Sequence, residues 1–292
     1  MQNRLRKIAL IGLSFILFFV FVGCSEETVN IDEKLKVAVS IVPEETFVKA
    51  VGGDLVEVVT MIPPGNSPAN YAPSPREMQM LSKALLYFSI GVPTEKSNII
   101  HKLADINRDI QLVALEEEVG KVYKACEFSK GNRDPHIWLS PKRVKVMIET
   151  IQNKLAQVDP KNKAIYEENA KNYIEKLDKL DKDIKSSIKD LPYKSFLVYH
   201  PSFGYFAEDY GLKMVSIEKE GKEANIEDIK TIIAYAKKEK IKVVFYQAEI
   251  DSKQSNVIAE EIGGKTKAIA PLAPNYIENL ENMAKTFADV LN

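Results

Sequence analysis

Two histidines lie in settings that suit metal binding. His136 lies in the run Asp134-Pro135-His136, in a loop that leads into a helix, and His200 directly follows an apolar strand. A proline beside each histidine restricts the backbone, which lowers the ordering cost of holding a ligand in place. Neutral imidazole nitrogen suits Zn²⁺, and mixed nitrogen and oxygen ligands also accept Mn²⁺. His136 and His200 are therefore candidate metal ligands.

Spacing alone does not establish a metal site here, since the separation of the two histidines is unlike that of a zinc finger. The third histidine, His101, is expected on a helix between apolar and charged neighbours, and we assign it no role. Metal-assisted hydrolysis would need an activated water and a general base. The sequence contains no nucleophile elbow, phosphate loop, His-Glu-x-x-His helix or paired-cysteine motif. We therefore expect a binding protein and not an enzyme, without catalytic residues or a catalytic cofactor.

Short β-branched runs alternate with amphipathic helical patterns along the chain. The expected strands are 35–42, 56–62, 85–90 and 110–114 in the first half, and 195–199, 213–217, 242–246 and 265–269 in the second. This alternation is typical of βαβ units, in which helices cover both faces of a parallel sheet. Such sheets bind ligands in the loops at their strand ends. The predicted fold is α/β with two lobes, each a mainly parallel four-stranded sheet flanked by helices.

One long charged segment separates the two halves. It is preceded by Asp159, a plausible N-cap, and ends before Pro192. Its apolar residues recur at three- and four-residue spacing, as expected for a half-buried helix: Ile165, Tyr173, Ile174, Leu177, Leu180, Ile184 and Ile188. We predict a rigid linking helix in the segment 158–191, and about thirty helical residues would span about 45 Å. A coiled-coil arm is the alternative, although the stripe is too short for several heptads.

The linking helix divides the chain into an N-terminal lobe, 34–157, and a C-terminal lobe, 192–292. A single rigid helix packed on both lobes resists wide closure, so we expect small lobe movements. Basic and acidic residues nearly balance, 40 against 41, without a basic block, which makes nucleic acid an unexpected partner. We expect a monomer.

The N-terminus has the layout of a secretory signal. Basic residues precede an apolar run, 8–22, which is shorter than the roughly 20 residues that a membrane-spanning helix needs. A small residue directly before Cys24 resembles the lipobox of bacterial lipoproteins. We therefore predict a signal peptide over 1–23, lipidation of Cys24, a tether over 24–33, and an extracytoplasmic protein anchored to the cell membrane. The alternative is a plain signal peptide with an incidental cysteine.

Several motifs together resemble one family, the solute-binding lipoproteins of zinc and manganese ABC transporters. They are Ser40 with Pro43, the proline-rich loop 63–75, Gly91 with Glu95, the box 134–138 and the box 200–206. The resemblance covers essentially the whole mature chain. It implies two α/β lobes joined by a long helix, with a transition-metal ion bound between them and passed to a cognate permease. Zn²⁺ is the expected transported ligand, ahead of Mn²⁺.

The resemblance places two of the family's four ligand positions on His136 and His200. The other two positions are occupied by Ala69, where relatives carry a histidine, and by Ala270, where relatives carry an aspartate. Alanine has no donor atom for a metal. Two histidines with water form an open, weak site, because a closed zinc site has four protein ligands.

Other side chains are candidates for the missing donors. Gln247, Glu249 and Asp251 follow an expected strand and share one side of an extended stretch, while Asn70 and Tyr71 offer oxygen atoms on the other lobe. Two alternatives to a bare-ion carrier remain open. The same scaffold would accept a chelated metal or another small ligand in the space left by the two alanines. The second alternative is an adhesin or structural lipoprotein that has the same fold but takes no part in transport.

Overall fold

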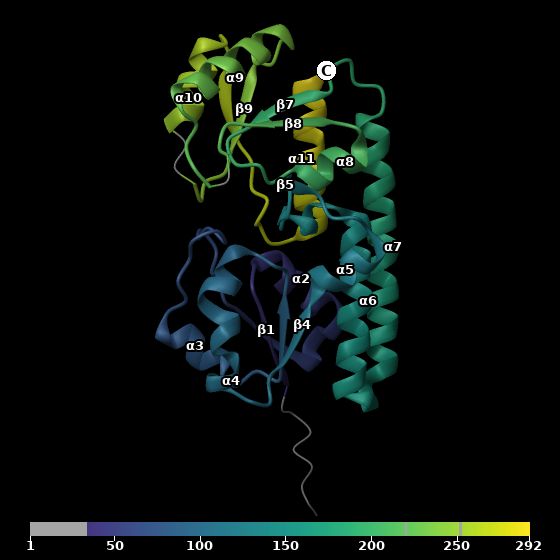
Figure 1. Ribbon diagram of the computed structural model, residues 1–292. Coiled ribbons are helices and arrows are strands. Elements are labelled where there is room, and N and C mark those ends of the chain that lie inside the picture. The colour runs from purple at the N-terminus through teal and green to yellow at the C-terminus, as the bar shows by residue number, and fades with distance from the viewer. Residues whose placement is uncertain (1–33, 220, 251–252) are drawn as a thin grey trace, which may run out of the picture. The chain divides into compact units, whose positions relative to one another are not determined.

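The computed structural model describes residues 34–219, 221–250 and 253–292. The predicted signal peptide, the tether and Cys24 lie outside the described residues. The first sheet contains β1 (Leu35–Val39), β2 (Val56–Thr60), β3 (Leu86–Ser89) and β4 (Gln111–Ala114) in the order β2-β1-β3-β4 (Figure 1). All neighbouring strands in it are parallel.

The second sheet repeats this architecture. It contains β7 (Ser195–Val198), β8 (Lys213–Ser216), β9 (Val243–Tyr246) and β10 (Lys265–Ala268) in the order β10-β9-β7-β8, again with parallel neighbours. Each of the eight strands lies within one of the eight expected strand segments, although β1 ends at Val39, three residues before the expected end at residue 42, where α2 begins. The predicted fold class, two lobes with parallel four-stranded sheets flanked by helices, is confirmed.

Helices cover the sheets of both lobes (Figure 1). Their bounds are α2 (Val42–Gly52), α3 (Pro75–Leu81), α4 (Leu103–Ile106), α5 (Leu115–Val122), α6 (Pro141–Val158), α8 (Gly204–Tyr210), α9 (Ile226–Lys238), α10 (Lys253–Glu261) and α11 (Tyr276–Leu291). Local sequence sets several of the starts. Ser74 caps α3 through the backbone amide of Glu77, and Asn225 caps α9 in the same way.

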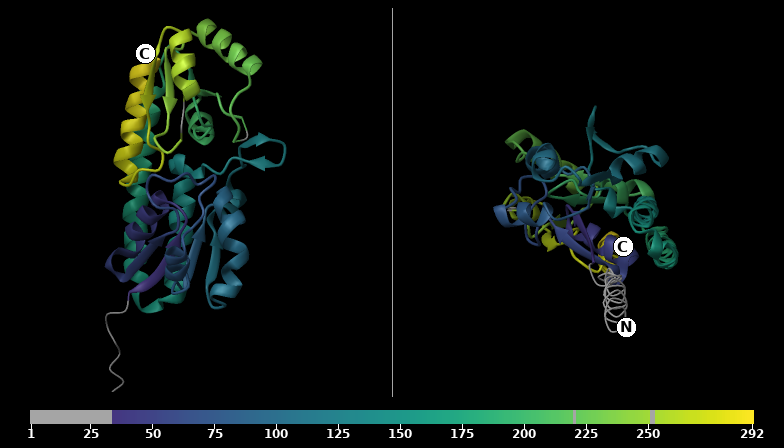
Figure 2. Two further views of the ribbon diagram at one scale, coloured as in Figure 1. Left: turned by 90° about the vertical axis from the view of Figure 1, so that its left-hand side faces the viewer. Right: turned by 90° about the horizontal axis from the view of Figure 1, so that it is seen from below.

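An antiparallel hairpin, β5 (Glu127–Ser129) with β6 (Asn132–Arg133), projects outward just before the His136 loop (Figure 2). The sequence did not predict it.

The long helix is α7 (Lys163–Ile188), which runs beside α6 (Figure 1). Its 26 residues correspond to about 39 Å. Residues Pro160–Asn162 form a separate 3₁₀ turn before it. The carboxylate of Asp159 accepts hydrogen bonds from the Asn162 side chain and the Tyr166 hydroxyl, each at 2.7 Å, so it holds this turn against the first turn of α7.

The two lobes share one hydrophobic core. Phe47 of α2 packs against Tyr173 of α7 and Tyr276 of α11, with ring centroids 6.4 and 4.9 Å apart. At its other end, α11 places Phe287 against Phe196 of the second sheet, at 4.7 Å. Helices α7 and α11 thus connect the cores of the two lobes, which supports the expected resistance to wide closure. Over the part of the chain that the structure describes, no helix has the length and apolar character of a membrane span.

Candidate metal centre

The second sheet brings three polar side chains to one edge. Strand β7 lies between β8 and β9. The chain passes from β7 to β8 on one side and then crosses to β9 on the other side of β7, and α/β sheets bind ligands at such a change of direction. His200 follows β7, Glu218 follows β8 and Gln247 follows β9 directly. All three line a common pocket.

The His136 ring is held by its own loop. The Asp134 carboxylate accepts hydrogen bonds from the His136 backbone amide at 2.9 Å and from Nδ1 at 2.7 Å. The ring of Trp138 packs at 5.1 Å from the imidazole, and its indole donates to the carbonyl of Pro271 at 3.0 Å. The His136 side chain therefore has little freedom to rotate.

The box around His200 also supports the His136 loop. A Cβ atom on Gly204 would lie 2.4 Å from Oδ2 of Asp134, so only glycine permits this close approach. The hydroxyl of the neighbouring Tyr205 donates to the Asp134 carbonyl at 2.8 Å. Gly204 and Tyr205 of the box 200–206 thus position Asp134 of the box 134–138.

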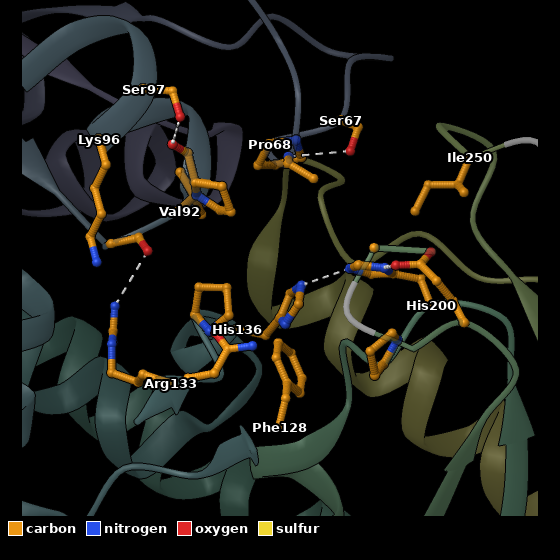
Figure 3. Close-up of a pocket in the computed structure, with 18 of the residues that line it drawn as sticks. Ser67, Pro68, Val92, Lys96, Ser97, Phe128, Arg133, His136, His200 and Ile250 are labelled. Carbon is orange, nitrogen blue, oxygen red and sulfur yellow. Dashed lines mark hydrogen bonds and ion pairs between the residues drawn. The ribbon is translucent and has the colours of Figure 1, made fainter. Parts of the chain in front are cut away.

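The two imidazoles face each other across the pocket (Figure 3). Their Nε2 atoms are 3.2 Å apart, and Nδ1 of His200 lies 3.0 Å from the Glu218 carboxylate. Ionised carboxylates only accept hydrogen bonds, which assigns the ring proton of each histidine to Nδ1 and leaves a lone pair on each Nε2. Two facing lone pairs repel unless they share a proton, as in a hydrogen bond, or a metal ion. A tetrahedral zinc with bonds of about 2.05 Å would place its nitrogens about 3.3 Å apart.

The electrostatics of His136 favour the metal-binding form. Burial lowers the pKa of its imidazole, and the neighbouring Asp134 carboxylate opposes this shift. The ring is therefore neutral at physiological pH. A carboxylate behind each histidine also fixes its orientation and raises its basicity toward a metal.

The pocket has a volume of about 560 Å³ and is lined by both lobes. Gln247 lines it, and its side-chain amide donates to the Ser202 hydroxyl at 2.6 Å. Glu249 is not among the lining residues, although its Oε2 is buried without a hydrogen-bond partner in the described chain. Asp251 lies outside the described residues.

The remaining candidate positions differ in their surroundings. Ala69 lines the pocket, whereas Ala270 is exposed and its carbonyl accepts from the Asn279 side chain. Asn70 is exposed, and the Tyr71 hydroxyl donates to Glu77. Within residues 34–219, 221–250 and 253–292, no group of three histidine, cysteine or acidic side chains converges as a metal site.

Sequence reasoning gave no role to the two carboxylates that orient the histidines. Asp134 lies in the box 134–138, and its position two residues before His136 is the signal that the sequence offers. Glu218 follows strand β8, whose pairing with β7 brings it to His200. That pairing was not readable from the sequence.

The family model for "Zinc-uptake complex component A periplasmic" (ZnuA) matches residues 37–290. The chain belongs to the ZnuA family. This confirms the resemblance to solute-binding proteins of metal transporters. Similar proteins include the high-affinity zinc uptake system protein ZnuA of Bacillus subtilis, at 31% identity over 82% of this chain and 79% of that protein. The zinc-binding lipoprotein AdcA of Streptococcus pneumoniae is 30% identical over 96% of this chain and 60% of its own length.

Solved structures agree with the ZnuA assignment. A crystal structure of ZnuA superposes with a TM-score of 0.84 at 35% identity, covering 89% of this chain and all of that one. The periplasmic zinc-binding protein TroA of Treponema pallidum, at 20% identity and a TM-score of 0.81, shares the fold.

Proposed function

We propose that this protein is the extracytoplasmic solute-binding component of a zinc-uptake ABC importer. It binds Zn²⁺ between its lobes through Nε2 of His136 and of His200 and delivers the ion to a cognate permease. The observation that carries the proposal is the 3.2 Å separation of two Nε2 atoms, each on a ring oriented by a carboxylate. Nitrogen donors favour Zn²⁺ over Mn²⁺, which prefers oxygen.

The third protein donor that we propose is Gln247. It lines the pocket, and its Nε2 donates to Ser202, which leaves its amide oxygen as the atom that faces a metal. Glu249 rests on sequence position alone, because it does not line the pocket. Ala69 and Ala270 leave the other positions without a protein donor.

We further propose that the mature protein is a monomer attached to the cell membrane through lipid on Cys24, and that it has no enzymatic activity. The support for lipidation is the small residue before Cys24 at the end of an apolar run, together with a streptococcal relative that is named a lipoprotein. Mass spectrometry of the N-terminal peptide from membranes tests it. A free Cys24 thiol would contradict the anchor.

Calorimetric titration of the metal-stripped protein with Zn²⁺ and Mn²⁺ tests the cargo. We expect Zn²⁺ to bind more tightly than Mn²⁺. Absence of binding tighter than about 100 μM, roughly −5.5 kcal/mol, for either ion would contradict the proposal.

A further inference from the structure

The pocket around the two histidines is much larger than a bare metal ion requires. Its volume of about 560 Å³ lies within the range of roughly 300–1,000 Å³ that is usual for small-molecule sites. A single water takes about 30 Å³ of liquid volume, so the pocket has room for a ligand of many atoms beside the ion. Ala69, which carries no donor, lines part of that space.

Two cationic side chains line the N-lobe side of this pocket, Lys96 and Arg133 (Figure 3). Lys96 is exposed, and no carboxylate of the described residues pairs with its amine. Among the described residues, the Arg133 guanidinium donates to the carbonyl oxygens of Ile90 at 3.3 Å and Gly91 at 3.5 Å, and it interacts electrostatically with the Glu116 carboxylate without a hydrogen bond to it, which leaves N–H groups for a ligand.

The position of Arg133 depends on a specific backbone feature. A Cβ atom on Gly91 would lie 1.8 Å from the guanidinium Nη2, and Gly91 has a φ of +86°. The positive φ favours glycine, and the missing Cβ leaves room for the guanidinium in this position. The guanidinium is thus seated beside the pocket by the local fold.

These cations favour an anionic ligand in the pocket. Among the described lining residues, Glu218 is the only acid, and its carboxylate is engaged by His200. The carboxylates of Asp134 and Glu218 hold the two imidazoles, whereas Lys96 has no carboxylate partner among the described residues. An anionic ligand on the metal would pair with Lys96 and Arg133.

We infer that the pocket takes Zn²⁺ as a complex with a small polycarboxylate. His136 and His200 supply two nitrogen ligands, carboxylate oxygens of the chelator supply further ligands from the space beside Ala69, and another carboxylate pairs with Lys96 and Arg133. This inference rests on the proposed zinc-binding function. Arg133 suits the role because its planar guanidinium matches a carboxylate in two parallel hydrogen bonds.

Equilibrium dialysis with citrate as the probe tests the inference. The metal-stripped protein is dialysed at buffered free Zn²⁺, with and without radiolabelled citrate. We expect one citrate to be retained per protein only when zinc is present, and the apparent zinc affinity at fixed free Zn²⁺ to rise at least tenfold. Zinc binding without citrate retention overturns this inference and leaves the proposed function intact. Absence of zinc binding under both conditions overturns both.

Variants locate the chelator. In Lys96→Gln, on an exposed position that does not endanger folding, we expect the citrate-dependent gain in zinc affinity to fall severalfold. Arg133→Lys keeps the charge but loses the paired hydrogen bonds, and should lower the gain in the same direction. Lys83→Gln, an exposed lysine outside the pocket, is the matched control and should retain the full gain. An unchanged gain in Lys96→Gln and Arg133→Lys overturns the assigned contacts, and an equal gain with inorganic phosphate overturns the polycarboxylate class.

Discussion

The two histidines are the residues on which metal binding depends most directly. We expect His136→Ala and His200→Ala each to weaken zinc binding by well over tenfold, because each removes one of the two facing imidazole nitrogens. Calorimetry of the metal-stripped variants measures the loss. His101→Ala is the control, since His101 is exposed and does not line the pocket. Unchanged affinity in both pocket variants would place the site elsewhere.

The carboxylate behind His200 contributes through the orientation of that ring. In Glu218→Gln the amide oxygen can still accept from Nδ1, but the negative charge that raises the basicity of the imidazole is lost. Partners of this kind typically contribute 10- to 100-fold to metal affinity, so we expect a loss of about tenfold. The exposed Glu223→Gln on the same lobe is the matched control. Equal zinc affinity in the two variants would refute a role for Glu218.

A second prediction at this scale concerns two buried carboxylates near the carboxyl end of β1. Glu44 and Glu95 are both fully buried, and Oε1 of Glu44 has no hydrogen-bond partner among the described residues. Burial, reinforced by the charge of Glu95, raises the pKa of Glu44 well above its ordinary value, and burial raises that of Glu95 to about 7. The folded state thus binds these protons more tightly than the unfolded state. The stabilisation from both groups is complete below the ordinary glutamate pKa of 4.5. The part from Glu95 is lost as the pH rises through its pKa of about 7, and the part from Glu44 is lost as the pH rises through its raised pKa.

Glu44→Gln tests this pH dependence. Glutamine mimics the protonated acid and can accept the same two amide hydrogen bonds, from Ser40 and Ile41. We expect the free energy of unfolding of the wild type to fall more than that of the variant as the pH rises from 5 to 8, because only the wild type has the raised pKa of Glu44. Urea unfolding at several pH values measures the difference. Parallel pH profiles would show that Glu44 remains charged.

Sequence reasoning identified individual residues better than their partners. The prolines beside His136 and His200 and the boxes around them pointed to both side chains that face each other in the pocket. Glu218 escaped notice because its contact with His200 arises from the pairing of β8 with β7, which is a long-range feature. The role of Gly204 is also a long-range feature and cannot be predicted from local sequence, since it depends on the approach of Asp134 from another loop.

At the scale of elements, short β-branched runs located all eight strands of the two sheets, since buried parallel strands are rich in apolar residues. Strand β10 (KTKA) is not a continuous apolar run, and both of its end residues are exposed. The hairpin β5–β6 carried no such signal, since its strands have three and two residues and are mostly exposed. The start of α7 also differs from the expected one. Asp159 was a plausible N-cap by type, but its carboxylate binds Asn162 and Tyr166, and the α-helix begins at Lys163.

Helix α7 supplies a large part of the shared core. Leu177 is fully buried on its apolar stripe. Leu177→Ala should lower the free energy of unfolding by about 2–5 kcal/mol, because it removes a buried side chain and leaves a cavity. The neighbouring Lys176→Ala, an exposed site where alanine favours helix, should change it by less than about 0.5 kcal/mol. Chemical denaturation measures both, and similar losses in the two variants would refute the buried role of the stripe.

For the whole molecule, the shared core predicts that the lobes unfold together. One hydrophobic cluster includes residues of both sheets and of α2, α7 and α11, and residues 34–292 form a single compact unit. Helices α7 and α11 make aromatic contacts with both lobes. If one lobe unfolded, the contacts of these helices with the other lobe would become exposed. A ligand between the lobes should therefore stabilise both to the same extent.

Unfolding with and without zinc tests this coupling. Free zinc at 100 times its dissociation constant should stabilise the folded state by about 2.7 kcal/mol. We expect fluorescence of Trp138, the single tryptophan, which packs on His136, and far-ultraviolet circular dichroism, which reports on both lobes, to give coincident transitions that shift together. A second transition whose midpoint does not change with zinc would show that one lobe unfolds independently, because zinc binding does not stabilise a lobe that is uncoupled from the site.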